Sequence, residues 1–339
     1  MKHTTLKDLS KVLNISVSAV SKALKGYKDI SDATRIEVLR MAEEMNYIPN
    51  LNAINLKTKQ TKTIGVIIPS IQNQFFSKVL TGVIEEAAKH GYLVITLQSN
   101  ENFELEKKHL QLVMQKQVDG ILISLSNQTK RCKHIEAIIQ NEVPIVMFDK
   151  INKLVKCSKI FIDDQQAAYK AVTHLIKKGY RRIAIFRGSL TPQNSIDRFL
   201  GYRKALIENG IEFDSSMVYL CENNDDFNDG FTNAQKLLSE KNNVDAIFAI
   251  TDLIAVGIIE CFKQNNIKIP EDIAVFGFSD WFMSSVITPT LTTIKQPGHE
   301  MGEKATQILI QEIENNNNET PSIIQNVVLP TSLIIRNST

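Results

Sequence analysis

Apolar residues near the start of the chain recur every three or four positions, the spacing that places side chains on one face of a helix. The first of these stripes consists of Leu6, Leu9, Val12 and Leu13. Thr5, directly before the stripe, is a residue type that caps helix N-termini, and Asp8 completes a capping box three positions later. The pattern predicts a short helix that begins after Thr5 and ends where Asn14 and Ile15 interrupt the stripe.

Two further helices are expected before residue 50. Ser16 caps the first of them, which ends near Gly26. Its inward residues are Ala19, Val20, Ala23 and Leu24. The next helix follows Ser31, and Pro49 stops the chain there. Its residues available for burial are Ile36, Leu39, Met41, Ala42 and Met45.

The outer face of the helix after Ser16 carries Val17, Ser18 and Lys22 instead of the Lys and Glu that usually cover an exposed face. Two short helices joined by a tight turn indicate a helix-turn-helix, whose second helix lies in the major groove of DNA. There Val17 can meet a thymine methyl group, Ser18 can hydrogen-bond a base edge, and Lys22 can reach guanine O6 and N7. The hydroxyls that suit phosphate oxygens are those of Ser16, Ser21 and Thr34. A three-helix packing domain with a polar outer face is the alternative.

The charge distribution also indicates a polyanionic partner for this region. Residues 1–62 contain 11 basic and 6 acidic residues, a net charge of +5, and the rest of the chain has a net charge of −3. A basic segment attached to a mildly acidic body is a footprint of nucleic-acid binding. A basic terminus can also serve solubility alone.

From Thr63 onward, short apolar runs alternate with helical stretches such as residues 77–90. The runs lack the two-residue alternation of a half-exposed strand, so we expect parallel strands buried on both faces. They cover residues 63–69, 92–98, 118–124, 143–149, 183–188, 244–250 and 273–279. This alternation is typical of open, doubly wound sheets, and the number of strands predicts two α/β lobes with a ligand crevice at the carboxyl ends of the strands.

Composition excludes several classes of protein. The length of 339 residues suggests two or three domains, and no apolar run reaches the roughly 18 residues that span a bilayer. The first ten residues lack the apolar core of a secretory signal, so we expect a cytoplasmic protein without a membrane partner. The cysteines at positions 132, 157, 221 and 261 form no C-x-x-C pair, which favours reduced thiols and no structural metal.

The sequence contains no recognisable catalytic motif. G-x-G-x-x-G, the P-loop, H-E-x-x-H and G-x-S-x-G do not occur, and the six histidines lack the spacing of metal ligands. We therefore expect no cofactor, no metal and no enzymatic activity.

The segment TLKDLSKVLNISVSAVSKALKG, followed by ISDATRIEVLRMAEEMNYIPN, resembles the headpiece of the LacI/GalR family of bacterial repressors. It departs from the family's pattern at Ser10, Ala19, Lys25 and Asn46. The resemblance implies an all-α helix-turn-helix headpiece over residues 1–49 and a hinge over residues 50–62. In this family the hinge folds on DNA and wedges a leucine into the minor groove, a position taken here by Leu56.

A solvated linker is the alternative for this polar hinge, and Asn52 replaces the small apolar residue common between paired hinges. The DNA contacts that we expect are Thr5, Ser16, Val17, Ser18, Ser21, Lys22, Thr34, Asn50, Ala53 and Leu56.

The body resembles the family's periplasmic-binding-protein-like core, through IGVIIPSIQNQFFSKVLTGVIEEAAKHGY, QKQVDGILIS, PIVMFD, RFLGYRKAL, TDLIAVG and GFSD…PTLTTIKQP. In this family the chain crosses between the lobes three times, and we place the crossings near Phe161, Thr290 and Val327. The implied first lobe comprises residues 63–160 and 291–326, and the second comprises residues 161–290 and 327–339.

The resemblance also implies effector-binding residues. Arg198 matches the arginine that clamps the ligand, and its planar guanidinium suits vicinal hydroxyls or a carboxylate. Asp149 closes a strand at the mouth of the crevice, and Phe75 or Phe76 can stack on a ring. The other expected contacts are Ser70, Thr251, Ser279, Asp280 and Trp281. Ser279 stands where the family usually has a ligand-binding aspartate.

Each of these side chains has a structural alternative. Arg198 could belong to a structural salt bridge, Phe75 to the core, and Trp281 to the packing beneath a lobe. Asp252 could cap the helix that follows Thr251.

These observations lead us to expect a transcriptional regulator, most simply a repressor, that binds a pseudo-palindromic operator as a dimer. A small molecule in the cleft, by analogy a sugar or sugar derivative, would control it by favouring one arrangement of the lobes. We expect a homodimer and not a tetramer because no leucine heptads follow LPTSLIIR. Two alternatives remain, a solute-binding protein of a transporter and a sugar-processing enzyme.

Overall fold

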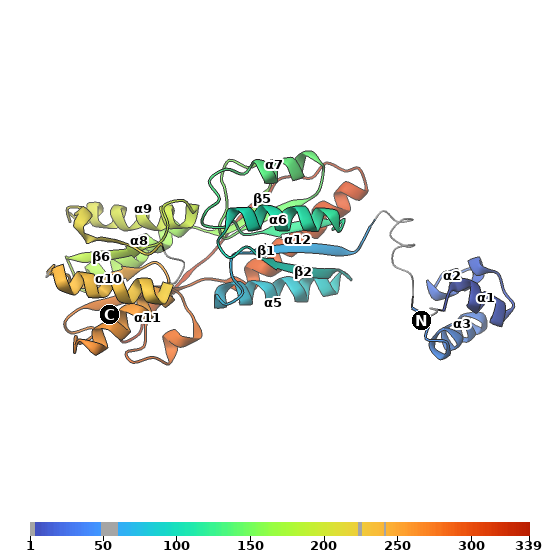
Figure 1. The fold of residues 1–339 in the computed structure, drawn as a ribbon, viewed down its shortest axis with the longest axis horizontal. Coiled ribbons are helices and arrows are strands. Elements are labelled where there is room, and N and C mark those ends of the chain that lie inside the picture. The colour runs from blue at the N-terminus through green and yellow to red at the C-terminus, as the bar shows by residue number, and fades with distance from the viewer. Residues whose placement is uncertain (1–3, 49–59, 223–225, 241) are drawn as a thin grey trace. The chain divides into compact units, whose positions relative to one another are not determined.

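The computed structural model describes residues 4–48, 60–222, 226–240 and 242–339. The described chain forms two compact units, which divide between Thr61 and Lys62. Figure 1 labels helices in both units and some of the strands of the second unit.

The described residues of the first unit form three helices, each with a hydroxyl residue at its N-cap. They are α1 (Leu6–Leu13), α2 (Val17–Leu24) and α3 (Asp32–Glu44). The capping box at α1 is present, because the Asp8 N–H donates to Thr5 Oγ1 at 3.2 Å and the Thr5 N–H donates to the Asp8 carboxylate at 2.9 Å. Ser16 accepts from the Ala19 N–H at 3.1 Å, as the sequence predicted.

The small core of this unit differs from the predicted one. Its fully buried apolar residues are Leu9, Val20, Ala23 and Val38. Val12, Ile36 and Leu39, expected inside, are 56%, 68% and 48% exposed. The helical period explains the error: positions 38, 41, 42 and 45 form one face of α3, and positions 36 and 39 fall outside it.

The second unit contains two sheets of mostly parallel strands, as predicted. The first sheet has the order β11-β5-β4-β3-β1-β2, and its pairs are parallel. Its strands are β1 (Thr63–Ile68), β2 (Leu93–Gln98), β3 (Gly120–Ile123), β4 (Ile145–Phe148), β5 (Ser158–Ile162) and β11 (Asn326–Leu329).

The second sheet has the order β12-β10-β9-β8-β6-β7, with β12 antiparallel to β10. Its strands are β6 (Ile183–Arg187), β7 (Val218–Leu220), β8 (Ala246–Ala249), β9 (Ala274–Ser279), β10 (Thr292–Lys295) and β12 (Ser332–Ile334).

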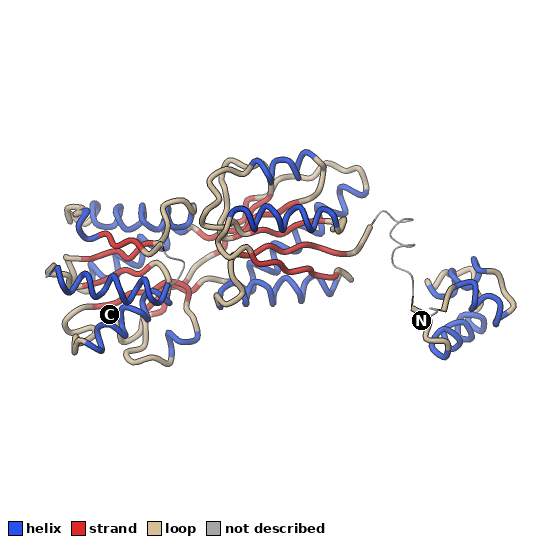
Figure 2. The backbone as a smooth tube through the Cα atoms, in the orientation of Figure 1, coloured by secondary structure: helices blue, strands red, loops and turns tan. Residues whose placement is uncertain are grey.

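Helices flank both sheets, and Figure 2 shows the strands between helical layers. Those of the first lobe are α5 (Gln74–Lys89), α6 (Phe103–Gln115), α7 (Lys133–Gln140) and α12 (Gly298–Asn317). Those of the second lobe are α8 (Asp164–Lys177), α9 (Gln193–Glu208), α10 (Asp226–Glu240) and α11 (Asp252–Gln264). Two short 3₁₀ helices, η1 (Ser215–Met217) and η2 (Phe282–Ser285), complete the second lobe. No helix in the described ranges is long and apolar enough to cross a membrane.

Strand pairing shows that two of the three crossings between the lobes lie closer to the C-terminus than predicted. The chain enters the second lobe directly after β5, close to the position expected at Phe161. Thr292–Lys295 pairs with β9 of the second sheet, so the return follows Lys295 and not Thr290. Val327 pairs with Ile160 in the first sheet, so the last crossing follows Leu329.

The second strand is also less buried than predicted. β2 lies at the edge of its sheet, and Leu93 is 65% exposed. A short apolar run in the sequence looks the same whether its strand is fully buried or lies at the open edge of a sheet, so the exposure of β2 could not be read from its residues.

Glycines bring α5 and α12 into direct backbone contact. A Cβ atom on Gly302 would lie 2.0 Å from the Val79 carbonyl oxygen, and one on Gly82 would lie 2.1 Å from the His299 carbonyl oxygen. Real Cβ contacts do not reach these distances, so the two helices pack this closely only because neither position has a side chain.

Candidate functional site

The exposed face of α2 is formed by small side chains at its N-terminal end. Val17 is 42% exposed, and Ser18 beside it is exposed as well. The hydroxyl oxygens of Ser16 and Ser18 lie 2.9 Å apart. This surface can approach a groove closely, and it offers a methyl-bearing side chain and hydroxyls for hydrogen bonds.

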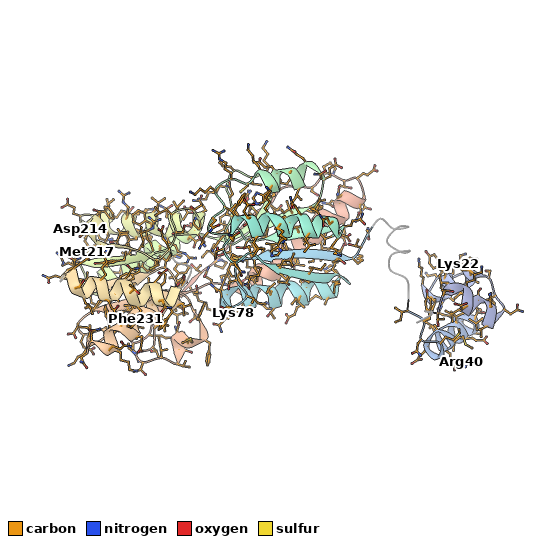
Figure 3. All side chains as sticks on the ribbon, viewed as in Figure 1. Lys22, Arg40, Lys78, Asp214, Met217 and Phe231 are labelled. Atoms are coloured by element: carbon orange, nitrogen blue, oxygen red, sulfur yellow. The ribbon has the colours of Figure 1, made fainter. Side chains whose placement is uncertain are left out.

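Lys22 lies one turn further along α2 and is labelled in Figure 3. It forms an ion pair with Asp29 in the loop before α3. The hydrogen bond that Lys22 donates to Asp29 raises the pKa of Lys22 and lowers the pKa of Asp29. Both side chains are about half exposed, at 47% and 53%. Exposed pairs are weak, so Lys22 can exchange Asp29 for another acceptor.

The other residues expected to contact DNA differ in their exposure and in their hydrogen-bond partners. The Thr5 hydroxyl donates to Asp8 at 2.7 Å, and the Thr34 hydroxyl lies 2.8 Å from that of Ser31. Ser21 is half-buried. Asn50, Ala53 and Leu56 lie outside the described residues, so their expected roles stay predictions.

A cavity of about 110 Å³ lies between the two lobes of the second unit. The first lobe lines it with Phe75, Phe76, Glu101, Asn127, Asp149 and Lys150. The second lobe contributes Ser195, Arg198, Cys221, Asp226, Thr251 and Ser279, and Gln296 lies on a connecting segment. Most of these residues follow the carboxyl ends of parallel strands, where α/β proteins bind ligands.

Six of the nine expected effector residues line this cavity: Phe75, Phe76, Asp149, Arg198, Thr251 and Ser279. Ser70, Asp280 and Trp281 are not among the lining residues. The Asp280 carboxylate instead accepts from Arg336 at 2.7 Å, and the Trp281 N–H donates to Asp252 at 2.8 Å. These contacts hold the segment after β9 to the body of the second lobe.

Arg198 on α9 is a buried ion-pair partner that also lines the cavity. Its Nε donates to Asp164 at 2.7 Å, and Nη1 donates to the Ile250 carbonyl oxygen at 2.7 Å. Its guanidinium lies 3.7 Å from the centroid of the Phe278 ring. The structural salt bridge considered for Arg198 is therefore present, and its expected contact with a ligand stays a prediction.

Two aspartates near Arg198 have raised pKa values. Burial raises the pKa of Asp149 to about 6, although Arg198 and Lys150 oppose the shift. Burial likewise raises the pKa of Asp164 to about 7, against the opposing charge of Arg198. Ionising either carboxylate inside the protein is costly, and a ligand that neutralises charge or donates hydrogen bonds would reduce that cost.

Three cavity residues that the sequence did not single out form one network in the first lobe. Lys150 Nζ donates to Glu101 at 2.6 Å and to Asn127 at 2.7 Å, and the Asn127 N–H donates to Glu101 at 2.7 Å. They follow β4, β2 and β3 respectively. Their places just after predicted strands were a usable signal, because those strand ends meet at one edge.

Asp226, at the start of α10, also escaped the sequence prediction. It accepts from the Thr251 hydroxyl at 2.8 Å, and burial raises its pKa. Thr251 is the N-cap of α11 and accepts from the Ile254 N–H at 3.2 Å. Asp252, considered as an alternative cap, is instead fully buried and accepts from Ser284 and Thr293 at 2.6 Å each.

The junction of β9 and the connecting segment leaves polar atoms facing the cavity region. Ser279 has a φ of 130°, which L-residues rarely adopt, and its hydroxyl donates to Gln296 Oε1 at 2.9 Å. The amide nitrogen of Gln296 and the hydroxyl of Ser195 are buried with no hydrogen-bond partner among the described residues. Buried polar atoms normally have partners, so each of these atoms can bond a ligand.

The described ranges contain no group of three or more His, Cys, Asp or Glu side chains arranged to hold a metal ion. Burial raises the pKa of the Cys221 thiol, which keeps it protonated in the cavity wall.

Comparison with known proteins places both units in one family. Residues 5–50 match the family described as bacterial regulatory proteins, lacI family. Residues 61–335 match the family described as periplasmic binding proteins and sugar binding domain of LacI family.

Several relatives match most or nearly all of this chain. The ribose operon repressor of Haemophilus influenzae is 32% identical, over 98% of this chain and 98% of its own. The lac repressor dimer bound to operator and the anti-inducer ONPF is 25% identical, with a TM-score of 0.88 over 99% of each chain. A LacI family regulator from Enterococcus faecium, solved with bound ribose, is 26% identical, with a TM-score of 0.73 over 82% of this chain and 98% of its own. The chain therefore belongs to the LacI family of bacterial regulatory proteins, as a DNA-binding transcriptional repressor with an effector-binding core and not an enzyme.

Proposed function

We propose that this repressor binds a pseudo-palindromic operator as a homodimer and that a small carbohydrate in the cavity between its lobes controls the binding. Operator binding places its action in the cytoplasm. The exposed face of α2 supports the DNA contact, with Val17, Ser18 and Lys22 reading bases and neighbouring hydroxyls holding phosphates.

The observation that carries the effector half of the proposal is that Asp149 and Arg198 line the cavity from different lobes. Asp149 follows β4 of the first lobe, and Arg198 lies on α9 of the second lobe. A carboxylate and a guanidinium together accept from and donate to the hydroxyls of a sugar. A ligand held by both residues therefore favours the arrangement in which the lobes are close.

Three polar contacts between described residues join the two lobes, and a change in the distance between the lobes would alter them. Lys153 of the first lobe pairs with Asp197 on α9 at 2.9 Å. Gln74 accepts from the Phe282 N–H at 2.7 Å, and Lys78 donates to the Asp280 carbonyl oxygen at 3.4 Å. An effector shifts the lobe equilibrium only by its difference in affinity for the two arrangements.

The proposal is tested by selecting duplexes from a random DNA pool with the full-length protein and measuring their affinity by fluorescence anisotropy. We expect an enriched sequence with two related half-sites, bound by two protomers. Sugars that raise the thermal midpoint are then added to the same titration, where we expect them to change the operator Kd. A pool without enrichment contradicts the DNA half, and a Kd unaffected by every binding sugar contradicts the effector half.

A further inference from the structure

The charged residues of the cavity are not balanced. Glu101, Asp149 and Asp226 line it as carboxylates, against Lys150 and Arg198 as cations. Both cations are already engaged. Lys150 pairs with Glu101 at 2.6 Å, and Arg198 pairs with Asp164 at 2.7 Å.

Two carboxylates consequently line the cavity without a direct cationic partner. Within the described part of the chain, neither Asp149 nor Asp226 forms an ion pair. Asp149 is 6% exposed and belongs to the first lobe, and Asp226 belongs to the second. The charges of Glu101 and Lys150 act on the pKa values of both, which indicates one shared electrostatic environment. Bringing the lobes together concentrates negative charge unless a cation enters with the ligand.

Two buried polar side-chain atoms without a partner among the described residues, Ser195 Oγ and Gln296 Nε2, point to a ligand at the same place. Ser195 and Gln296 line the cavity and are 4% and 5% exposed. The Ser195 hydroxyl can donate or accept, and the Gln296 amide nitrogen can only donate. Hydroxyl oxygens on the ligand satisfy both groups, so the ligand carries hydroxyls as well as positive charge.

We propose that the effector is an amino sugar, whose ammonium group binds between Asp149 and Asp226 and whose hydroxyls bind Ser195, Gln296 and Arg198. This proposal rests on the proposed function, and it specifies the class of effector. An ammonium group donates three hydrogen bonds and neutralises charge from both lobes. A neutral sugar would supply only the hydroxyl contacts.

A phosphorylated sugar is the competing outcome. A neighbouring cavity of about 340 Å³ is lined by Lys130, Lys150 and Lys153. Lys150 is paired with Glu101 and Lys153 with Asp197, so two of these three ammonium groups already have acidic partners. We therefore favour the amine, and the test includes phosphates.

The test compares matched sugars by isothermal titration calorimetry with the full chain at neutral pH. The probes are glucosamine, galactosamine and mannosamine, each with its neutral parent and with glucose 6-phosphate and glucosamine 6-phosphate. We expect at least one amine to bind about tenfold or more tightly than its parent, a difference of about 1.4 kcal/mol. Equal binding of amine and parent, tighter binding of a phosphate, or no binding by any amine overturns the proposal.

Asp226→Asn separates charge from shape, because the amide keeps the size of the carboxylate and can still accept from Thr251. We expect the variant to bind amine and parent with about equal affinity while still binding the parent. Glu271→Gln removes one exposed carboxylate from the same lobe outside the cavity and should keep the preference. A preference that survives in Asp226→Asn removes Asp226 from the site. Operator selection with the same preparation tests the proposed function independently, so either proposal can fail alone.

Discussion

Arg198 and Asp164 form an ion pair with an Nε to Oδ1 distance of 2.7 Å, and their side chains are only 6% and 5% exposed. The pair joins the start of α8 to α9 and holds the guanidinium at the cavity wall. The same side chain therefore forms a structural ion pair and, in our proposal, binds the ligand.

Replacing Arg198 by lysine tests this double role. Lysine cannot reproduce the fork that reaches Asp164 and the Ile250 carbonyl oxygen together, so the free energy of unfolding should fall by about 2–4 kcal/mol. Urea denaturation measures this loss, and calorimetry with the effector should show weakened binding. Lys204→Ala, an exposed cation on the same helix, is the control and should change neither quantity. Unchanged stability in Arg198→Lys would show that the pair contributes little.

The raised pKa of Asp149 predicts that the stability of the protein depends on pH. Its pKa rises from an ordinary value near 4 to about 6 on folding, so the folded state binds the extra proton between these values. Its contribution to stability is therefore complete below pH 4 and is lost as the pH rises through about 6. Asp149→Asn cannot ionise, so relative to wild type it should gain about 3 kcal/mol between pH 4 and pH 8. Urea denaturation across that range measures the difference, from which groups common to both proteins cancel. A constant difference would contradict the burial of an ionisable Asp149.

Lys22 is expected to read a base once it leaves Asp29. Lys22→Ala should cost about 1–3 kcal/mol on the selected operator and much less on unrelated duplexes. Fluorescence anisotropy on both kinds of DNA measures the change. Lys11→Ala removes the same charge from α1 and should weaken both by similar amounts. If Lys22→Ala weakens binding to both kinds of DNA equally, Lys22 contacts a phosphate and not a base.

The same pair makes a prediction for Asp29. Asp29→Asn removes the charge that holds Lys22, so operator binding should become modestly tighter, with a steeper dependence on salt. Anisotropy titrations at several salt concentrations measure both effects. Asp32→Asn is the control, because Asp32 pairs with Arg35 instead. Weaker binding in Asp29→Asn would indicate that the pair positions Lys22 for DNA.

Gly302 should tolerate no side chain. A Cβ atom there would lie 2.0 Å from the Val79 carbonyl oxygen, so Gly302→Ala must push α12 away from α5 and should cost about 1–3 kcal/mol. Thermal and urea midpoints measure the loss. Glu314→Ala, at an exposed position of α12, should leave both midpoints nearly unchanged. Normal stability in Gly302→Ala would mean that the helices separate at little cost.

Local interactions account for what could be predicted from residue patterns. Thr5, Ser16 and Ser31 cap their helices because each bonds a backbone N–H within three residues. The apolar runs became parallel strands because burial on both faces needs only a contiguous apolar segment. Such a run does not reveal whether its strand lies at the edge or in the centre of a sheet, so the exposure of β2 was not predicted.

The sequence by itself determined the helices and their caps, most of the strands, the two-lobed α/β class and the family resemblance, because these depend on neighbours along the chain. Only the tertiary structure decided that Glu101, Asn127 and Lys150 form one network and that Asp226 lines the same cavity from the other lobe. It also decided that Lys22 pairs with Asp29 and that two crossings follow later residues than expected. These relationships depend on strand order and on how loops fold back, which bring together residues whose spacing in sequence carries no record of the contact.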